Sequence, residues 1–290
     1  MNTQWSTYVQ RAETLYQSRV LRFSDRFREK YKNAFAIDEK ASILEIGCGP
    51  GALSEALTKW YPRSNVIGTD RDSNFIAFAK KKAPTVTFLE EDATALSFAD
   101  ESFDVTISNT VAEHIAPEKF YGEQYRVLKK SGVCLVLSAR KGIHHEAPCI
   151  AVQSDFEKEI WKRTEEICMK ADKENVVCAF PKNEMEMPKI MEEYGFHSVS
   201  TEYITINLTP DHPCYDSETA HRIIEMNRIC ALDGIDILSD TARSLVRPDE
   251  LSEMRRLINE RYDKRLALYD KGIKQWDTYM SLIMILRGVK

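Results

Sequence analysis

Residues 43–51 of this 290-residue chain read ILEIGCGPG, and this stretch decides the fold. An apolar run typical of a buried strand passes into three glycines at alternate positions, and a helical pattern over residues 51–60 follows. Glycine permits positive φ angles and lets a ligand approach bare backbone, while the N-terminus of a helix offers N–H donors to an anionic group. The stretch therefore predicts a ligand-binding loop between a buried strand and a helix.

Apolar segments alternate with amphipathic helical segments through the first half of the chain. Alternation of this kind implies right-handed crossovers and a parallel sheet covered by helices on both faces. We expect a Rossmann-like, doubly wound α/β fold with a mostly parallel, seven-stranded sheet. The predicted strands are 41–47, 64–70, 86–92, 103–109, 132–139, 197–208 and 279–289.

The same pattern predicts a domain organisation with two helical insertions. Residues 1–40 form an N-terminal helical cap, and the core comprises residues 41–143, 183–208 and 277–290. Residues 144–182 and 209–276 are helical insertions after the fifth and sixth strands. Because ligands of doubly wound sheets bind at the carboxyl ends of the strands, we expect these insertions to close a cleft as a lid.

The glycine loop by itself is compatible with two kinds of ligand. Gly47, Gly49 and Ala52 also fit the dinucleotide pattern GxGxxG/A, with Asp70 at the distance expected of a ribose-binding carboxylate. Glu45, however, stands where dinucleotide-binding folds usually have an apolar residue, and Asp92 follows the third strand, where an adenine edge can be read. A NAD-dependent oxidoreductase is therefore the less favoured alternative.

Four stretches together resemble the motifs of the class I S-adenosylmethionine-dependent methyltransferases. They are ILEIGCGPG, the segment Gly68-Thr69-Asp70, residues 89–115 (LEEDATALSFADESFDVTISNTVAEHI) and residues 126–138 (RVLKKSGVCLVLS). The resemblance implies a methyltransferase that uses S-adenosyl-L-methionine and releases S-adenosyl-L-homocysteine. It is specific for fold and cofactor, and it says nothing of the methyl acceptor.

The resemblance also implies roles for individual cofactor-binding residues. The glycine loop would pack against the methionine part of the cofactor, Asp70 would accept from both ribose hydroxyls, and the loop after the third strand would read the adenine. The end of the fourth strand would flank the sulfonium. The implied set is Glu45, Gly47, Cys48, Gly49, Gly51, Asp70, Arg71, Asp92, Ala93, Asn109 and Thr110.

Candidates for catalysis and for substrate binding come from the edge of the sheet where ligands bind. His114 is the first candidate for a general base because an imidazole titrates near working pH, and Glu113 is a weaker one. A packing or cofactor-lining role for His114 stays open. Substrate-lining candidates are Tyr8, Tyr16, Arg19, His144 and His145.

Charge and motifs favour a small-molecule acceptor over nucleic acid. The net charge is −5, whereas a phosphate backbone requires a basic face. Residues 109–112 read NTVA, without the Asn/Asp-Pro-Pro-aromatic signature of base-amine methyltransferases and without a Pro-Cys nucleophile. A nucleic-acid methyltransferase, or a protein that binds S-adenosylmethionine without transferring methyl, are the alternatives.

The remaining composition predicts a cytoplasmic protein without a membrane partner. No apolar run approaches the roughly 20 residues needed to cross a bilayer, and the N-terminus lacks the layout of a secretory signal. The seven cysteines are scattered without a CxxC pair. No group of residues has a recognisable metal-ligand spacing, so we expect no metal; the oligomeric state stays open.

Overall fold

A seven-stranded sheet runs through the molecule, as the sequence predicts. The computed structural model describes residues 5–145 and 151–290, and the side chains of residues 140–145 lie outside its description. The strand order is β3-β2-β1-β4-β5-β7-β6, parallel except for β7, which is antiparallel to β5 and β6. The strands are β1 (Ser42–Ile46), β2 (Asn65–Asp70), β3 (Thr87–Glu90), β4 (Phe103–Asn109), β5 (Leu128–His145), β6 (His197–Leu208) and β7 (Thr278–Val289).

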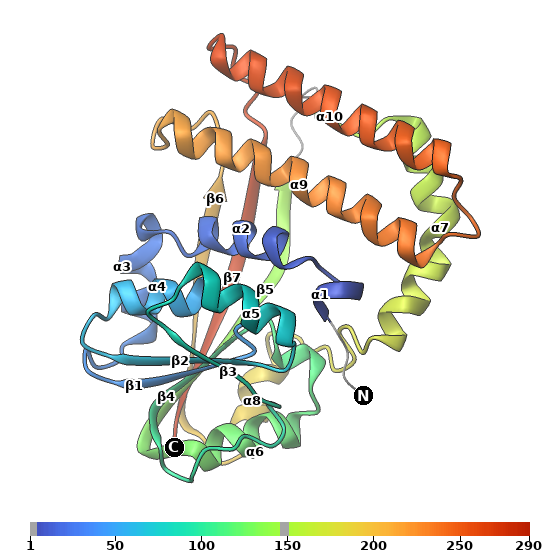
Figure 1. Cartoon of the computed structure of the whole chain (residues 1–290). Coiled ribbons are helices and arrows are strands. Elements are labelled where there is room, and N and C mark those ends of the chain that lie inside the picture. Colours follow the sequence, from blue (N-terminus) through green and yellow to red (C-terminus); the bar gives the residue numbers. More distant parts are fainter. Residues whose placement is uncertain (1–4, 146–150) are drawn as a thin grey trace.

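Helices cover both faces of this sheet, which explains why its central strands are continuous apolar runs. One face carries α3 (Arg28–Phe35), α4 (Ala52–Trp60) and α5 (Ser73–Lys82), and the opposite face carries α6 (Pro117–Val127) and α8 (Glu186–Glu193) (Figure 1). The helix α4 begins directly after the glycine loop, with Gly51 as its N-cap residue. The fold class predicted from the sequence is confirmed.

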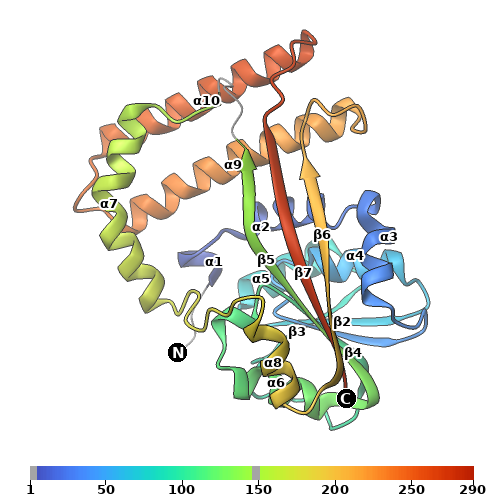
Figure 2. The same ribbon diagram turned by 180° about the vertical axis from the view of Figure 1, so that it is seen from behind.

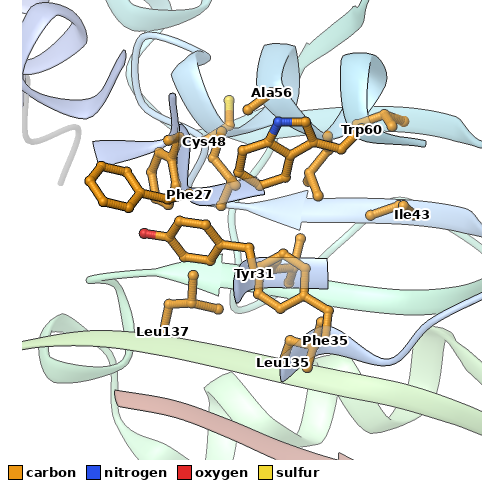
Figure 3. Packing of buried hydrophobic residues seen from close by; sticks show 14 of the residues in the cluster. Phe27, Tyr31, Phe35, Ile43, Cys48, Ala56, Trp60, Leu135 and Leu137 are labelled. Atoms are coloured by element: carbon orange, nitrogen blue, oxygen red, sulfur yellow. The ribbon is translucent and has the colours of Figure 1, made fainter. Parts of the chain in front are cut away.

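The N-terminal helices share the main hydrophobic core with the sheet. Tyr31 of α3 is fully buried, and its ring stacks on Trp60 of α4 with 5.3 Å between the ring centroids (Figure 3). Phe35, one helical turn further on, is also fully buried beside Leu135 of β5. Residues 28–35 are therefore part of the sheet's own packing, and they fix the position of the segment that precedes them.

Three helices of the predicted insertions stand at one end of the sheet. These are α7 (Asp155–Glu174), α9 (Ser217–Thr241) and α10 (Pro248–Asp270), and β5, β7 and β6 extend past the other strands toward them (Figure 2). The helices enclose a small apolar cluster of their own that includes Ile160, Ile235 and Met254. None of the helices in the described ranges combines the length and the apolar character that crossing a bilayer requires.

Buried ion pairs hold this helical unit in place. The Arg265 guanidinium is fully buried and donates to Asp211 at 2.8 Å and to Asp277 at 2.6 Å. Arg261 of α10 donates to the buried Glu157 of α7 at 2.6 Å. Because a buried charge without a partner costs several kcal/mol, these pairs define how α10 docks onto α7 and onto the start of β7.

Candidate cofactor and active site

A cavity of about 290 Å³ lies at the carboxyl ends of β1, β2 and β4. The strand order reverses between β1 and β4, and the crevice at such a point is where open α/β sheets bind ligands. The cavity brings together ten of the eleven residues predicted to bind the cofactor. They are Glu45, Gly47, Cys48, Gly49, Asp70, Arg71, Asp92, Ala93, Asn109 and Thr110.

The eleventh residue, Gly51, has a structural role instead. Gly47 (φ +69°) and Gly49 (φ +52°) line the cavity, but Gly51 (φ +88°) turns away from it. A Cβ atom at Gly51 would lie 2.8 Å from Phe88 Cζ and 2.9 Å from Ala79 Cβ. Gly51 therefore does not line the cavity as predicted. Its lack of a side chain instead lets α4, α5 and β3 pack closely together.

Asp70, the last residue of β2, anchors the glycine loop. One carboxylate oxygen accepts from the Gly49 backbone N–H at 2.8 Å, and the other accepts from the Asp72 N–H at 2.9 Å. Burial raises the pKa of Asp70 to about 6, although both backbone hydrogen bonds oppose the shift. Since a carboxylate oxygen has two lone pairs, each oxygen keeps acceptor capacity for a ligand hydroxyl.

Glu45 lies deeper, at the end of β1, and is almost completely buried. The Ser54 hydroxyl of α4 donates to its carboxylate. Burial raises the pKa of Glu45 to about 8, so the side chain is protonated at neutral pH in the absence of a ligand cation. A cationic group beside Glu45 would favour the ionised form, because opposite charges stabilise each other.

The loop after β3 presents Asp92 and Ala93 to the other end of the cavity. Oδ1 of Asp92 accepts from both the backbone N–H of Thr94 at 2.8 Å and its hydroxyl at 2.7 Å. Burial acts to raise the pKa of Asp92, but these hydrogen bonds outweigh it and the pKa is lowered. Asp92 therefore closes a turn with one oxygen, and its Oδ2 accepts no hydrogen bond from the described residues.

The end of β4 is strained. Thr110 is a non-glycine residue at φ +55°, held there by its backbone N–H, which donates to Leu137 O at 2.8 Å. Its hydroxyl donates to Asn109 O at 2.7 Å and accepts from Nη2 of Arg19 at 3.3 Å. Such strain persists where surrounding structure enforces it, commonly at functional sites. The result is a guanidinium fixed at the edge of the cavity.

His114 lines the cavity within the short helix η2 (Ala112–His114), in an environment that disfavours a general base. Its Nδ1 accepts from the backbone N–H of Cys178 at 2.9 Å, and the edge of the ring meets Trp5 at 4.6 Å between centroids. Burial lowers the pKa of His114 to about 4. The neutral ring therefore carries its proton on Nε2 and has no lone pair free to take another.

We predict that the His114 imidazole stays neutral between pH 5 and pH 8, because burial lowers its pKa more than the Val176 backbone raises it, and that the Cys178 hydrogen bond to Nδ1 keeps the proton on Nε2. Nitrogen-15 NMR of the histidine side chains through this range measures both the tautomer and the titration midpoint. The exposed His197 provides the internal comparison. A midpoint above pH 6 for His114 would restore it as a candidate base.

The N-terminal helices α1 (Trp5–Tyr8) and α2 (Ala12–Arg22) form the wall opposite the glycine loop. The backbone N–H of Ser6 donates to Asp72 Oδ2 at 2.7 Å, and its hydroxyl donates to Oδ1 at 3.1 Å. Among the residues that the structure describes, none of 209–276 lines the cavity, and α9 instead packs behind α2. The predicted cover by the insertion is therefore corrected: α1 and α2 cover the cavity directly.

Several predicted substrate and catalytic residues lie elsewhere. Tyr8 is 57% exposed, and Tyr16 donates its hydroxyl to Glu55 at 2.6 Å, so neither lines the cavity. Both belong to amphipathic helices whose inward face the sequence pattern leaves ambiguous. Glu113 lines a smaller neighbouring cavity beside Ser138 and Phe180. The backbones of residues 144 and 145 pair with β7 at the end of β5, and the side chains of His144 and His145 lie outside the described residues.

The walls of the cavity include residues that the sequence reasoning missed. Many are apolar residues of the N-terminal helices and of α5, which the sequence pattern does not distinguish from core residues, and only Glu91 and Val111 lie just after a strand. Across the described side chains, residues 5–139 and 151–290, no three His, Cys, Asp or Glu are grouped as a metal site would require. The missed residues include Trp5, Gln10, Leu15, Phe23, Thr69, Phe75, Glu91, Val111 and Ile115.

Comparison with known proteins shows that the part of the chain holding this site resembles methyltransferases. Residues 44–136 match the family model described as a methyltransferase domain. The chain is 37% identical over 127 residues to a demethylmenaquinone methyltransferase of Thermus thermophilus, covering 41% of this chain and 58% of that protein. It is 36% identical over 104 residues to a ubiquinone biosynthesis O-methyltransferase of Cereibacter sphaeroides, covering 34% and 41%.

A solved structure shares the fold over the whole chain. Haemonchus contortus phosphoethanolamine N-methyltransferase 2, in complex with S-adenosyl-L-methionine, aligns with 100% of this chain and 60% of its own, at 18% identity and a TM-score of 0.53. The alignments span less than two thirds of the curated relatives' lengths, so the match concerns a domain. Residues 44–136, which hold the glycine loop and Asp70, thus match the methyltransferase domain model and are similar to these S-adenosylmethionine-dependent methyltransferases.

Proposed function

We propose that the chain binds S-adenosylmethionine in the cavity between β1 and β4 and transfers its methyl group to a small-molecule acceptor. The observation that carries the proposal is the arrangement of Asp70 beside the bare backbone of Gly47 and Gly49. Each oxygen of Asp70 has one backbone donor and room for one more. That arrangement suits the two vicinal hydroxyls of a ribose.

The rest of the cavity is consistent with the same cofactor. Oδ2 of Asp92, which has no donor among the described residues, offers an acceptor for an exocyclic amine, and the apolar Phe75 and Ile115 contribute surface for an aromatic base. Glu45, neutral in the ligand-free protein, offers a carboxylate toward an ammonium group. Residue types and spacing thus support an adenosine at one end and an amino acid at the other.

The residues of this chain contribute positioning and exclusion of water more than proton transfer. The cofactor supplies a methyl group on a sulfonium, which is a good leaving group, so alignment with the acceptor supplies most of the acceleration. The helices α1 and α2 exclude water from the cavity, and Asn109 and Thr110 border its β4 end. In this proposal His114 has a structural role. It lines the cavity and is held by the hydrogen bond from the Cys178 backbone and by the ring contact with Trp5.

The acceptor class is supported by charge and by the relatives. The chain is net acidic, with 45 Asp and Glu against 40 Lys and Arg, which gives no general attraction to nucleic acid. The relatives are named for demethylmenaquinone and for ubiquinone biosynthesis. Both names refer to small molecules, so a small-molecule acceptor is the substrate class that we propose.

The test is a metabolite-extract screen with methyl-labelled S-adenosylmethionine. We expect one small-molecule fraction to gain label with the wild-type chain and to gain none with an Asp70→Ala variant. Label in RNA or DNA instead would contradict the proposed acceptor. Binding of the cofactor without labelling of any fraction would favour a protein that uses the ligand without transferring methyl.

We further predict that cofactor affinity falls as the pH falls below about 6, the pKa to which burial raises Asp70. The ionised carboxylate accepts from hydroxyls, and the pKa is raised, so the acceptor form is present above pH 6 and is lost below it. Affinity for S-adenosylhomocysteine should drop about tenfold per pH unit below this midpoint. Glu45 is protonated in the ligand-free protein throughout this range, because its pKa is about 8, so a proton that it releases on meeting the ammonium group adds the same slope to the wild type and to a variant of Asp70.

Calorimetric titration of S-adenosylhomocysteine between pH 4.5 and pH 7.5 measures this dependence. An Asp70→Asn variant, which has no carboxylate to titrate at this position, should bind more weakly and should lack the additional fall in affinity below pH 6. A wild-type profile parallel to that of Asp70→Asn would show that Asp70 does not carry the ligand's hydroxyls.

A further inference from the structure

Two arginines of α2 carry positive charge to the β4 end of the cavity. Arg19 lines the cavity and donates to the Thr110 hydroxyl at 3.3 Å. Arg22, nearly one helical turn further along, donates to the Tyr279 hydroxyl of β7 at 2.6 Å, with its guanidinium 5.3 Å from the ring centroid. Both hydrogen bonds go to neutral hydroxyls, and among the described residues neither guanidinium forms an ion pair with a carboxylate.

Other arginines that are largely buried form ion pairs with carboxylates. Arg265 pairs with Asp211 and Asp277, Arg261 pairs with Glu157, and Arg228 pairs with Asp263 at 2.7 Å. For Arg19 and Arg22, the described residues supply no carboxylate within ion-pair distance. Burial lowers the pKa of Arg19 to about 9, and the neighbouring Arg22 charge adds to the effect, while the more distant Glu113 charge opposes it without forming an ion pair. An uncompensated guanidinium in a cavity attracts an oxyanion.

The cofactor of the proposed function does not neutralise this pair of charges. S-adenosylmethionine carries one carboxylate against an ammonium and a sulfonium, so it adds net positive charge. Glu45, the buried acid at the same cavity, faces that ammonium in our proposal. Arg71, the other arginine that lines the cavity, is exposed to solvent at the opposite end. The unmatched positive charge therefore remains where the acceptor must approach.

We propose that Arg19, reinforced by Arg22, forms an anion subsite at the β4 end of the cavity that binds an oxyanion group, carboxylate or phosphate, of the methyl acceptor. This inference rests on the proposed function, and it narrows the acceptor from any small molecule to an acidic one. Thr110 acts as a positioning residue, since its strained backbone directs the hydroxyl that holds the Arg19 guanidinium. The planar guanidinium then has further N–H groups for a bidentate contact with the oxyanion.

The test uses the full chain saturated with S-adenosylhomocysteine. Acetate and inorganic phosphate are titrated by calorimetry, with acetamide as the neutral counterpart of acetate. We expect at least one anion to bind, acetamide not to bind, and Arg19→Gln to weaken anion binding by at least about tenfold. Arg19→Lys should retain part of the affinity, because it keeps the charge and loses the planar fork. Arg28→Gln, an equal charge change at an exposed arginine of α3, should bind like wild type.

The affinity for S-adenosylhomocysteine is measured first, for every variant. Retention of that affinity in Arg19→Gln shows that the variant is folded and that the subsite belongs to the acceptor. A loss of more than tenfold overturns the inference, because the cofactor's own carboxylate would then be the partner of Arg19. Absence of anion binding to the loaded wild type, or equal binding to Arg19→Gln, overturns it as well. Failure of the wild type to bind S-adenosylhomocysteine contradicts the proposed function itself.

Discussion

Replacement of Asp70 by alanine is expected to weaken S-adenosylhomocysteine binding about 100-fold, because two hydrogen bonds to a charged group contribute about 1.5 kcal/mol or more each. In our proposal Asp70 accepts from both ribose hydroxyls, and it also fixes the backbone of Gly49 through a 2.8 Å hydrogen bond. Its removal therefore takes away the sugar contact and loosens the loop that forms the cavity wall. Isothermal titration calorimetry at pH 7.5 measures the effect.

Asp38→Ala is the matched control for this substitution. Asp38 is exposed in the loop before β1, at the end of the strand opposite the cavity, and accepts from the Lys40 backbone N–H at 2.7 Å. It should bind S-adenosylhomocysteine like wild type. An Asp70→Ala affinity within twofold of wild type would show that the ribose lies elsewhere.

Gly51→Ala is expected to lower the free energy of unfolding by about 3 kcal/mol, since a strained backbone and an overfilled site each cost about 1–3 kcal/mol. Gly51 has φ +88°, and a Cβ atom there would lie 2.8 Å from Phe88 and 2.9 Å from Ala79. These neighbours belong to β3 and α5, which are both packed in the core. Relief of the clash must therefore shift the start of α4 and the glycine loop. Urea denaturation monitored by circular dichroism measures the change.

Alanine substitutions at two other glycines separate the cost of backbone strain from the cost of close packing. Gly272 has φ +70°, and a Cβ atom there would have no described neighbour within 4 Å, so Gly272→Ala should cost only the backbone strain, about 1 kcal/mol. Gly122 is exposed within α6 and has equally open surroundings in the described structure, so Gly122→Ala should stabilise the protein by about 0.5 kcal/mol. If Gly51→Ala cost no more than Gly272→Ala, close packing at Gly51 would play no part.

The central part of the fold follows from the sequence because its physical cause is local. Parallel strands covered on both faces are typically nearly continuous apolar runs, and the runs at 43–46 and 133–137 lie in β1 and β5. Residues 197–208 form β6 with the predicted bounds. The cofactor loop is equally local, since a strand, a glycine turn and a helix N-terminus are adjacent in sequence.

Features that depend on distant partners escape this kind of reasoning. The strand β5 continues to His145, beyond the predicted end at residue 139, because it pairs with β7 across more than 130 residues of chain. Arginine is mostly exposed in proteins, yet Arg265 of α10 is fully buried between Asp211 and Asp277. Nothing in the local pattern of α10 indicates these two partners.

The candidate site also has a part that local sequence predicts and a part that depends on distant residues. The residues at the ends of β1, β2 and β4 are identified by their place in the sequence, and all but one of the predicted cofactor-binding residues line the cavity. Gly51 resembles Gly47 and Gly49 in the motif, and only the positions of Phe88 and Ala79 reveal its packing role. The sequence names Arg19 as one candidate among several, while the lack of a carboxylate partner among the described residues emerges only in three dimensions.

Equilibrium dialysis of the wild-type chain with methyl-labelled S-adenosylmethionine tests the central claim most directly. We predict one binding site per chain, from which S-adenosylhomocysteine displaces the label and NAD does not. An absence of saturable binding, or displacement of the label by NAD but not by S-adenosylhomocysteine, would contradict the assignment of this cavity.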